Sequence, residues 1–231
     1  MKIKSQILSQ ASGSLGGLTA AHNRGGLYFR ARTIPTNPAT LQQSVVRSAM
    51  ADLNNRWVNT LTAAQRIAWE VYANNVLLTD TLGEPRAVTA LNMYQRSNVV
   101  AVQNSLTVVD DAPAIFDTGG PGDFDDGSST ITAASDELSL AFYVGDDWVD
   151  ETGAHMIVSC SRPQNASVNF FKGPFRVVGT IAGDNSSAPT SPQTYTLPFA
   201  ASAGQKVFVQ TRVRRADGRL TLPFRAGIIA A

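Results

Sequence analysis

The sequence has 231 residues, 43% of them hydrophobic, and a formal net charge of +1. This length allows one large domain or two small ones with real cores, and the balanced composition excludes a disordered or fibrous chain. The only cysteine, Cys160, excludes an internal disulfide, which favours a protein made in a reducing compartment.

Charge is unevenly distributed along the chain. The first 51 positions contain no carboxylate, whereas the span from Ser97 to Ser161 contains neither lysine nor arginine. This polarity suits contacts with other proteins. We expect no nucleic-acid partner, because no helix carries a Lys/Arg cluster and no aromatic platform accompanies the basic residues. The basic residues of the first span are Lys2, Lys4, Arg24, Arg30, Arg32 and Arg47.

Residues 1–35 form a basic, glycine-rich arm. Two extended runs, Ser14–Ala21 and Leu27–Thr33, are joined by HNRGG, whose glycines allow the positive φ of a tight turn. The pattern predicts a β-hairpin. Gly16 and Gly17 indicate a bulge or close backbone packing rather than a phosphate-binding loop, because no Walker lysine follows them.

Residues 36–112 are predicted to form a small three-helix domain. Asn37 is expected to cap a first helix that starts at Pro38, and Thr62 with Gln65 forms a capping box for a second, antiparallel helix. A third helix is predicted from Thr89 to about residue 104. The expected buried face of the first helix is Leu41, Val45, Ala49, Leu53 and Trp57, flanked by Val46 and Met50. The expected core anchors of the helical hairpin are Leu53, Trp57, Ile67 and Trp69.

From residue 113 to 231 the apolar period changes to two, which indicates strands. In the run Leu138–Val144, for example, Leu138, Leu140, Phe142 and Val144 are expected to share one face. A hairpin turn is predicted at Arg215–Arg219, and the chain that follows this turn is the seventh predicted strand. Strand number and spacing predict an antiparallel β-sandwich of immunoglobulin-like or fibronectin-like type, so the fold class is α+β. The other predicted strands are Ser129–Ala134, Ala154–Cys160, Phe175–Ala182, Thr194–Phe199 and Lys206–Arg215.

Residues that could perform catalysis are few and scattered. His22 and His155 have no partner at metal-ligand spacing, and Cys160 lies in an apolar strand. We therefore expect no enzyme activity, no cofactor and no metal. Two alternatives stay open: a calcium loop at Asp123–Gly127, which lacks the EF-hand spacing, and a sugar site at Trp148, which stands in an acidic loop.

A membrane location is not expected. No run approaches the roughly 18–20 apolar residues that span a bilayer. The first residues carry lysines but no continuous apolar segment, so a secretory signal is not predicted.

The stretch Thr36–Ala73 carries the pattern TNPxTxQQxxVR, then a tryptophan, then LTxAQRxAWxxYA. This pattern resembles a group of proteins encoded in the structural gene clusters of bacteriophages and prophages. The segments GSLGGLTAAHNRGGLYFRAR, SRPQNASVNFFKGPFRVVGTI and GQKVFVQTRVRRADGR resemble the same group. The resemblance thus spans most of the chain, and its motif marks architecture rather than an active site.

The resemblance implies a virion component assembled in the host cytoplasm. With the basic arm, it leads us to expect a capsid decoration (cement) protein, a homotrimer that binds the major capsid protein or other virion proteins through the arm. A neck or tail accessory protein, or one that binds glycans on the host surface, is the alternative. Copy number per virion would separate the capsid from the neck or tail.

Overall fold

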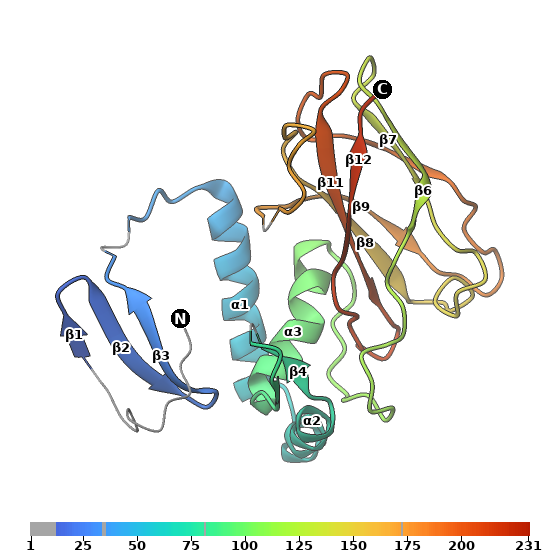
Figure 1. Cartoon of the computed structure of the whole chain (residues 1–231). Coiled ribbons are helices and arrows are strands. Elements are labelled where there is room, and N and C mark those ends of the chain that lie inside the picture. The colour runs from blue at the N-terminus through green and yellow to red at the C-terminus, as the bar shows by residue number, and fades with distance from the viewer. Residues whose placement is uncertain (1–12, 34–35, 81, 172) are drawn as a thin grey trace. The chain divides into compact units, whose positions relative to one another are not determined.

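The structure, a computed structural model, describes residues 13–33, 36–80, 82–171 and 173–231. The chain folds as two compact units, Met1–Gln95 and Arg96–Ala231. The described residues form helices and small antiparallel sheets, which confirms the α+β prediction (Figure 1).

The arm forms a three-stranded antiparallel sheet, here called the arm sheet, made of β1 (Gly13–Leu15), β2 (Leu18–Asn23) and β3 (Gly26–Ala31). The predicted hairpin is β2–β3, and Gly26 has φ +99° at its turn. Gly16 and Gly17 do not form the expected bulge. They form the turn between β1 and β2, where Gly16 has φ +56°, a conformation that glycine adopts without a steric penalty.

Helix α1 (Leu41–Asn59) starts later than predicted. Ala39 has φ +47°, which interrupts helical geometry before Thr40, and Thr40 is the N-cap instead of Asn37. The Thr40 hydroxyl accepts a hydrogen bond from Gln43 N at 3.3 Å. The Asn37 side chain accepts from Ala39 N and from Arg47 Nη2, so it stabilises the entry to the helix rather than its first turn.

Helix α2 (Ala63–Asn75) confirms the predicted capping box. Gln65 N donates to Thr62 Oγ1 at 3.3 Å, and Thr62 N donates to Gln65 Oε1 at 2.9 Å. Figure 1 shows α2 end-on while α1 runs from top to bottom of the view, so the two helices cross steeply rather than lying antiparallel. The short strands β4 (Leu78–Thr79) and β5 (Pro85–Arg86) follow, then α3 (Ala90–Gln103).

The core of the first unit is aromatic. The Trp69 ring lies 5.8 Å from Tyr72 and 5.4 Å from Tyr94, both edge-on, and Trp57 lies 5.5 Å from Tyr94. Leu53 and Trp69 are buried as predicted, and Trp57 is half-buried.

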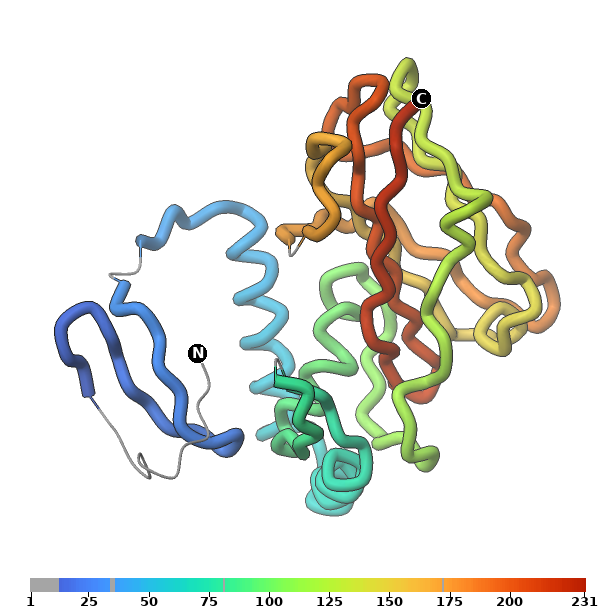
Figure 2. Tube along the Cα trace, in the orientation of Figure 1, coloured from blue at the N-terminus to red at the C-terminus, as the bar shows by residue number. Residues whose placement is uncertain are grey.

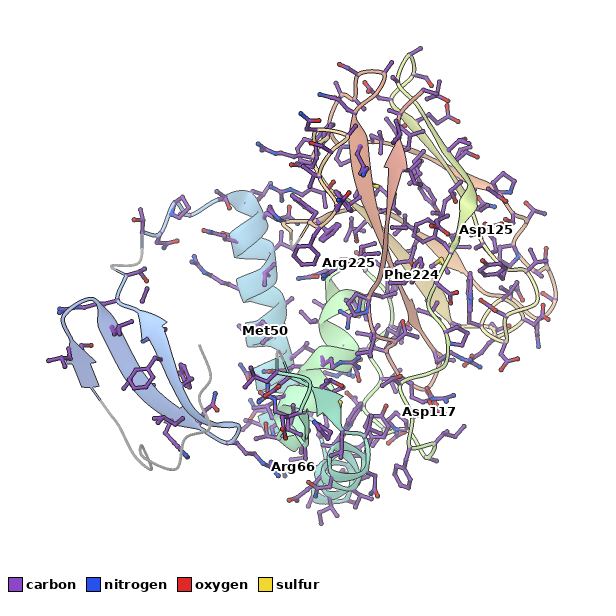
Figure 3. The ribbon with its side chains drawn as sticks, viewed as in Figure 1. Met50, Arg66, Asp117, Asp125, Phe224 and Arg225 are labelled. Carbon is purple, nitrogen blue, oxygen red and sulfur yellow. The ribbon has the colours of Figure 1, made fainter. Side chains whose placement is uncertain are left out.

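Two parts of the predicted helical core are wrong. Ile67 is 62% exposed, because α2 buries the face that carries Trp69, Tyr72 and Ala73 instead. At the start of α1, Leu41, Val45 and Val46 are exposed, so the predicted apolar face is covered only from Ala49 onward. Met50, labelled in Figure 3, is half-buried.

The second unit is a β-sandwich with a three-stranded sheet, β10-β7-β6, and a four-stranded sheet, β12-β11-β8-β9. A parallel bridge between Ile131 and Ala230 brings β12 beside β6, as the trace in Figure 2 shows. The strands are β6 (Asp125–Thr132), β7 (Glu137–Ala141), β8 (His155–Cys160), β9 (Arg176–Ala182), β10 (Gln193–Thr196), β11 (Lys206–Arg214) and β12 (Phe224–Ile229).

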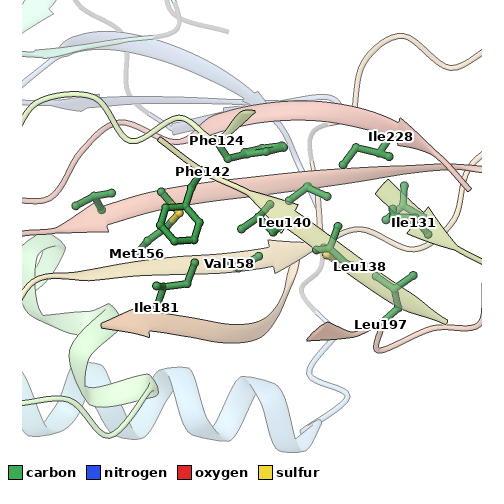
Figure 4. Close-up of a cluster of buried hydrophobic side chains, with 14 of the residues drawn as sticks. Phe124, Ile131, Leu138, Leu140, Phe142, Met156, Val158, Ile181, Leu197 and Ile228 are labelled. Carbon is green, nitrogen blue, oxygen red and sulfur yellow. The ribbon is translucent and has the colours of Figure 1, made fainter. Parts of the chain in front are cut away.

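Every second side chain of a strand points into the sandwich core. Leu138, Leu140 and Phe142 face inward as predicted, against Met156 and Val158 of the other sheet (Figure 4). Val144 does not follow them, and it is 57% exposed. The reason is that β7 ends at Ala141, so a period of two no longer governs the chain there.

The division between the two units falls inside α3, at Gln95 and Arg96. The sequence interpretation placed all of residues 36–112 in one helical domain. In the structure, the C-terminal half of α3 belongs with the sandwich, because the guanidinium of Arg214 on β11 donates to Ser97 O and Asn98 Oδ1.

Candidate interaction surfaces

The arm sheet has two different faces. In an antiparallel pair, residues directly opposite each other place their side chains on the same face. Leu18 lies opposite both Leu15 and Ala31, and Ala20 lies opposite Phe29. Leu15 is 88% and Leu18 55% exposed. The apolar residues of this face are Leu15, Leu18, Ala20, Leu27, Phe29 and Ala31, and His22 lies on the same face opposite Leu27.

The opposite side, here called the basic face, carries Thr19, Tyr28, Arg30 and Arg32. Thr19 lies opposite Arg30, and Arg32 N donates to Gly17 O at 2.8 Å, which continues the same register by two residues. Arg30 and Arg32 are exposed. Within the described residues, their guanidinium groups make no hydrogen bond or ion pair.

Of the six basic residues predicted to bind a partner, the four that the structure describes do not form one patch. Lys2 and Lys4 lie outside the described residues. Arg24 sits in the β2–β3 turn, and its Nη1 donates to Val88 O at 3.4 Å. Arg47 lies on α1 and donates to Asn37. Among these four described residues, the structure brings together only Arg30, on β3, and Arg32, just after it.

A second surface, here called the acidic patch, lies on the sandwich. Pairing of Asp125 with Ala141 places the start of β6 beside the end of β7, and Asp125 is labelled in Figure 3. The turn after β7 then returns the chain, because Asp146 N donates to Tyr143 O at 3.2 Å. The patch consists of the exposed Tyr143 and Val144 with Asp123, Asp125, Asp126, Asp146 and Asp147.

The carboxylates of this patch interact with one another and with Tyr143. Partial desolvation, and then repulsion from Asp125, Asp123, Asp126 and Asp146, raises the pKa of the Tyr143 hydroxyl. Burial raises the pKa of Asp146, the hydrogen bond from Trp148 Nε1 opposes this rise, and the charges of Asp123 and Asp147 add to it. The patch is therefore a cluster of carboxylates whose like charges act on one another around an exposed aromatic side chain.

The two residues considered for catalysis do not meet. Cys160 is buried in the sandwich core, and burial raises the pKa of its thiol to about 12, so the reactive thiolate is disfavoured. His155 lies on the opposite face of the same strand, opposite Arg214. Burial, with a smaller effect of Arg214, lowers the pKa of His155. Strand alternation separates the two side chains, so they cannot form a thiol–imidazole pair.

The sugar-binding interpretation of Trp148 is wrong. Its side chain is buried in the sandwich core, where it packs 5.5 Å from Phe142 and donates through Nε1 to Asp146 Oδ2. A buried indole cannot stack on a sugar ring. At the proposed calcium loop, Asp125 Oδ1 accepts from Ser128 N, and the described residues contain no group of three or more His, Cys, Asp or Glu placed to hold a metal ion.

Sequence reasoning missed an ionic cluster at the β11–β12 turn. Arg215 pairs with Glu151, and Arg219 Nη1 donates to Asp117 Oδ1 at 2.7 Å. Partial burial acts to raise the pKa of Asp117, but hydrogen bonds from Arg219 and Gly119 hold it below the ordinary value. The run RVRRADGR could have indicated this cluster. It places several arginines beside a tight turn, and such arginines need carboxylate partners from other segments of the chain. These arginines are already paired inside the second unit.

No helix within the described part of the chain has the length and apolar character needed to cross a bilayer. No family model, curated protein or solved structure matches the sequence or the fold. The functional proposal therefore depends on the surfaces of the arm sheet and the sandwich.

Proposed function

We propose that the chain is a bacteriophage virion structural protein, a capsid decoration protein that binds the major capsid lattice through its arm and stabilises the head as a trimer. The resemblance of Thr36–Ala73 to proteins of phage structural gene clusters motivates this proposal. One observation carries it further: the arm is an amphipathic sheet whose apolar residues Leu15 and Leu18 are exposed.

A three-stranded sheet of short strands buries little surface by itself and needs a covered apolar face for stability. Exposed leucines at the tip of such a sheet are a cost in an isolated chain, because each gains roughly 1.5–3 kcal/mol when it is buried. A capsid surface that covers this face would recover that free energy. The apolar face is accordingly the proposed lattice contact.

The test is a double variant, Leu15→Asp/Leu18→Asp, added to purified capsids that lack the protein. We expect its occupancy on capsids to fall at least tenfold relative to the wild type. Leu222→Asp is the matched control, since Leu222 is also 55% exposed but lies on the sandwich unit, and it should bind normally. Equal occupancy of wild type and double variant would refute the lattice contact.

Copy number separates this proposal from a neck or tail accessory protein. Decoration of a lattice requires on the order of hundreds of copies per particle, whereas a neck or tail ring requires about six to twelve. Quantitative mass spectrometry of purified virions gives this number. Absence of the chain from purified virions would refute both the decoration role and the neck or tail role.

A further inference from the structure

The acidic patch and the basic face are complementary in charge and in chemistry. The patch surrounds Tyr143, which is 47% exposed, with carboxylates. The sequence around it, from Ser97 to Ser161, supplies no lysine or arginine to neutralise them. The basic face places Arg30 and Arg32 beside Tyr28, in a stretch without any carboxylate.

Five arginines of the second unit are already bound within it. Arg212 donates to Thr221 O through Nε and Nη2, both at 3.3 Å. Arg225, labelled in Figure 3, donates to Gln210 Oε1 at 2.8 Å and lies over the Phe175 ring. Arg214, Arg215 and Arg219 are held by the contacts described above. Arg30 and Arg32 differ from these arginines in being exposed and two residues apart on one face of a sheet.

We propose that the basic face of the arm sheet in one copy of this chain docks on the acidic patch of a second copy. Arg30 and Arg32 would pair with carboxylates of the patch, because a guanidinium matches a carboxylate in planar, two-point geometry. Tyr28 would pack against Tyr143, since aromatic side chains contribute most when they are covered at the centre of a contact.

This contact joins two different surfaces, so it is heterologous. Repetition of a heterologous contact closes into a ring or extends as a filament. The inference rests on the proposed function in one respect only: the proposed trimer sets the number of copies in a closed ring. The contact itself is tested without capsids, so its failure is distinguishable from failure of the virion proposal.

The experiment uses charge-reversed full-length chains in sedimentation equilibrium at about 50 mM salt, where screening is weak. Arg30→Glu/Arg32→Glu reverses the basic face, and Asp123→Lys/Asp126→Lys reverses the acidic patch. We expect each variant alone to self-associate at least tenfold more weakly than the wild type. An equimolar mixture should restore association, because each reversed surface then meets a complementary one.

Arg66→Glu/Arg86→Glu is the matched control, with the same charge change elsewhere in the first unit, and it should associate like the wild type. Protection of the Cys160 thiol from labelling verifies that the sandwich of each variant is folded, and circular dichroism at 222 nm verifies the helices of the first unit. A wild type that is monomeric at every concentration would overturn the proposal, as would a mixture that stays dissociated. Loss of capsid binding by Arg30→Glu/Arg32→Glu, with self-association unchanged, would assign the basic face to the lattice instead and also overturn it.

Discussion

Arg214 is the residue on which the attachment of α3 to the sandwich depends most directly. Its side chain is 2% exposed, and it donates to Ser97 O at 3.1 Å, Asn98 Oδ1 at 3.2 Å and Thr107 O at 3.0 Å. Burial lowers its pKa, with a smaller opposing effect of Asp217. A buried guanidinium is tolerated here because three oxygen acceptors, two of them backbone carbonyls, receive its protons.

Truncation of Arg214 to alanine should therefore be costly. The variant leaves two buried carbonyls and one amide without their donor, and we expect a loss of about 3 kcal/mol in the free energy of unfolding. Urea denaturation of the second unit measures it. Arg225→Ala, at an exposed position on β12, should change stability by less than about 1 kcal/mol. Similar effects of the two substitutions would contradict this account.

Asp146 gives a second residue-scale prediction, with a defined sign. Its pKa is raised in the fold, so the ionised carboxylate is less favourable in the native than in the unfolded chain. This cost is absent at low pH and appears as pH rises through the raised pKa. Asp146→Asn keeps an acceptor for Trp148 and removes the charge. We expect it to stabilise the protein by about 0.5 kcal/mol at pH 7.

Thermal denaturation as a function of pH checks this prediction. Below the ordinary Asp pKa of 3.8, wild type and variant are both neutral at position 146, and their stabilities should converge. Asp150→Asn, at an exposed aspartate outside the patch, is the control. A variant less stable than the wild type at pH 7 would show that the carboxylate is needed as a hydrogen-bond acceptor.

At the scale of elements, local signals were predictable where the interacting residues are close in sequence. The capping box is an example, because Thr62 and Gln65 are three residues apart and satisfy each other in the same turn. The start of α1 was not predictable in this way. It depends on the left-handed conformation of Ala39, which this residue type rarely adopts.

The capping box should contribute measurably to the first unit. Thr62→Ala removes the acceptor for Gln65 N and should cost about 1 kcal/mol of stability. Thr60→Ala, at an exposed threonine just before it, is the control and should be nearly neutral. Chemical denaturation followed by circular dichroism at 222 nm reports both. Equal effects would mean that the box adds nothing beyond helix propensity.

At the scale of the whole molecule, sequence predicted the classes of element but not the surfaces that they form. The acidic patch combines Asp123 and Asp126 with Asp146, about twenty residues away, and only the β6–β7 pairing and the following turn bring them together. The two faces of the arm sheet depend on a register that begins at the Gly16–Gly17 turn. A pattern of charges along a chain does not specify such pairings.

Each unit has its own buried core, so each should unfold as its own cooperative transition. Cys160 is a built-in probe, because it is the only cysteine of the chain and is buried in the sandwich.

Leu53→Ala creates a cavity in the first unit and should cost about 2–5 kcal/mol there. It should shift the transition at 222 nm to lower urea while leaving the urea dependence of Cys160 labelling unchanged. Leu140→Ala in the sandwich core should have the reverse effect. If both substitutions moved both transitions equally, the two units would unfold as one, and α3, which belongs to both, would be the element that couples them.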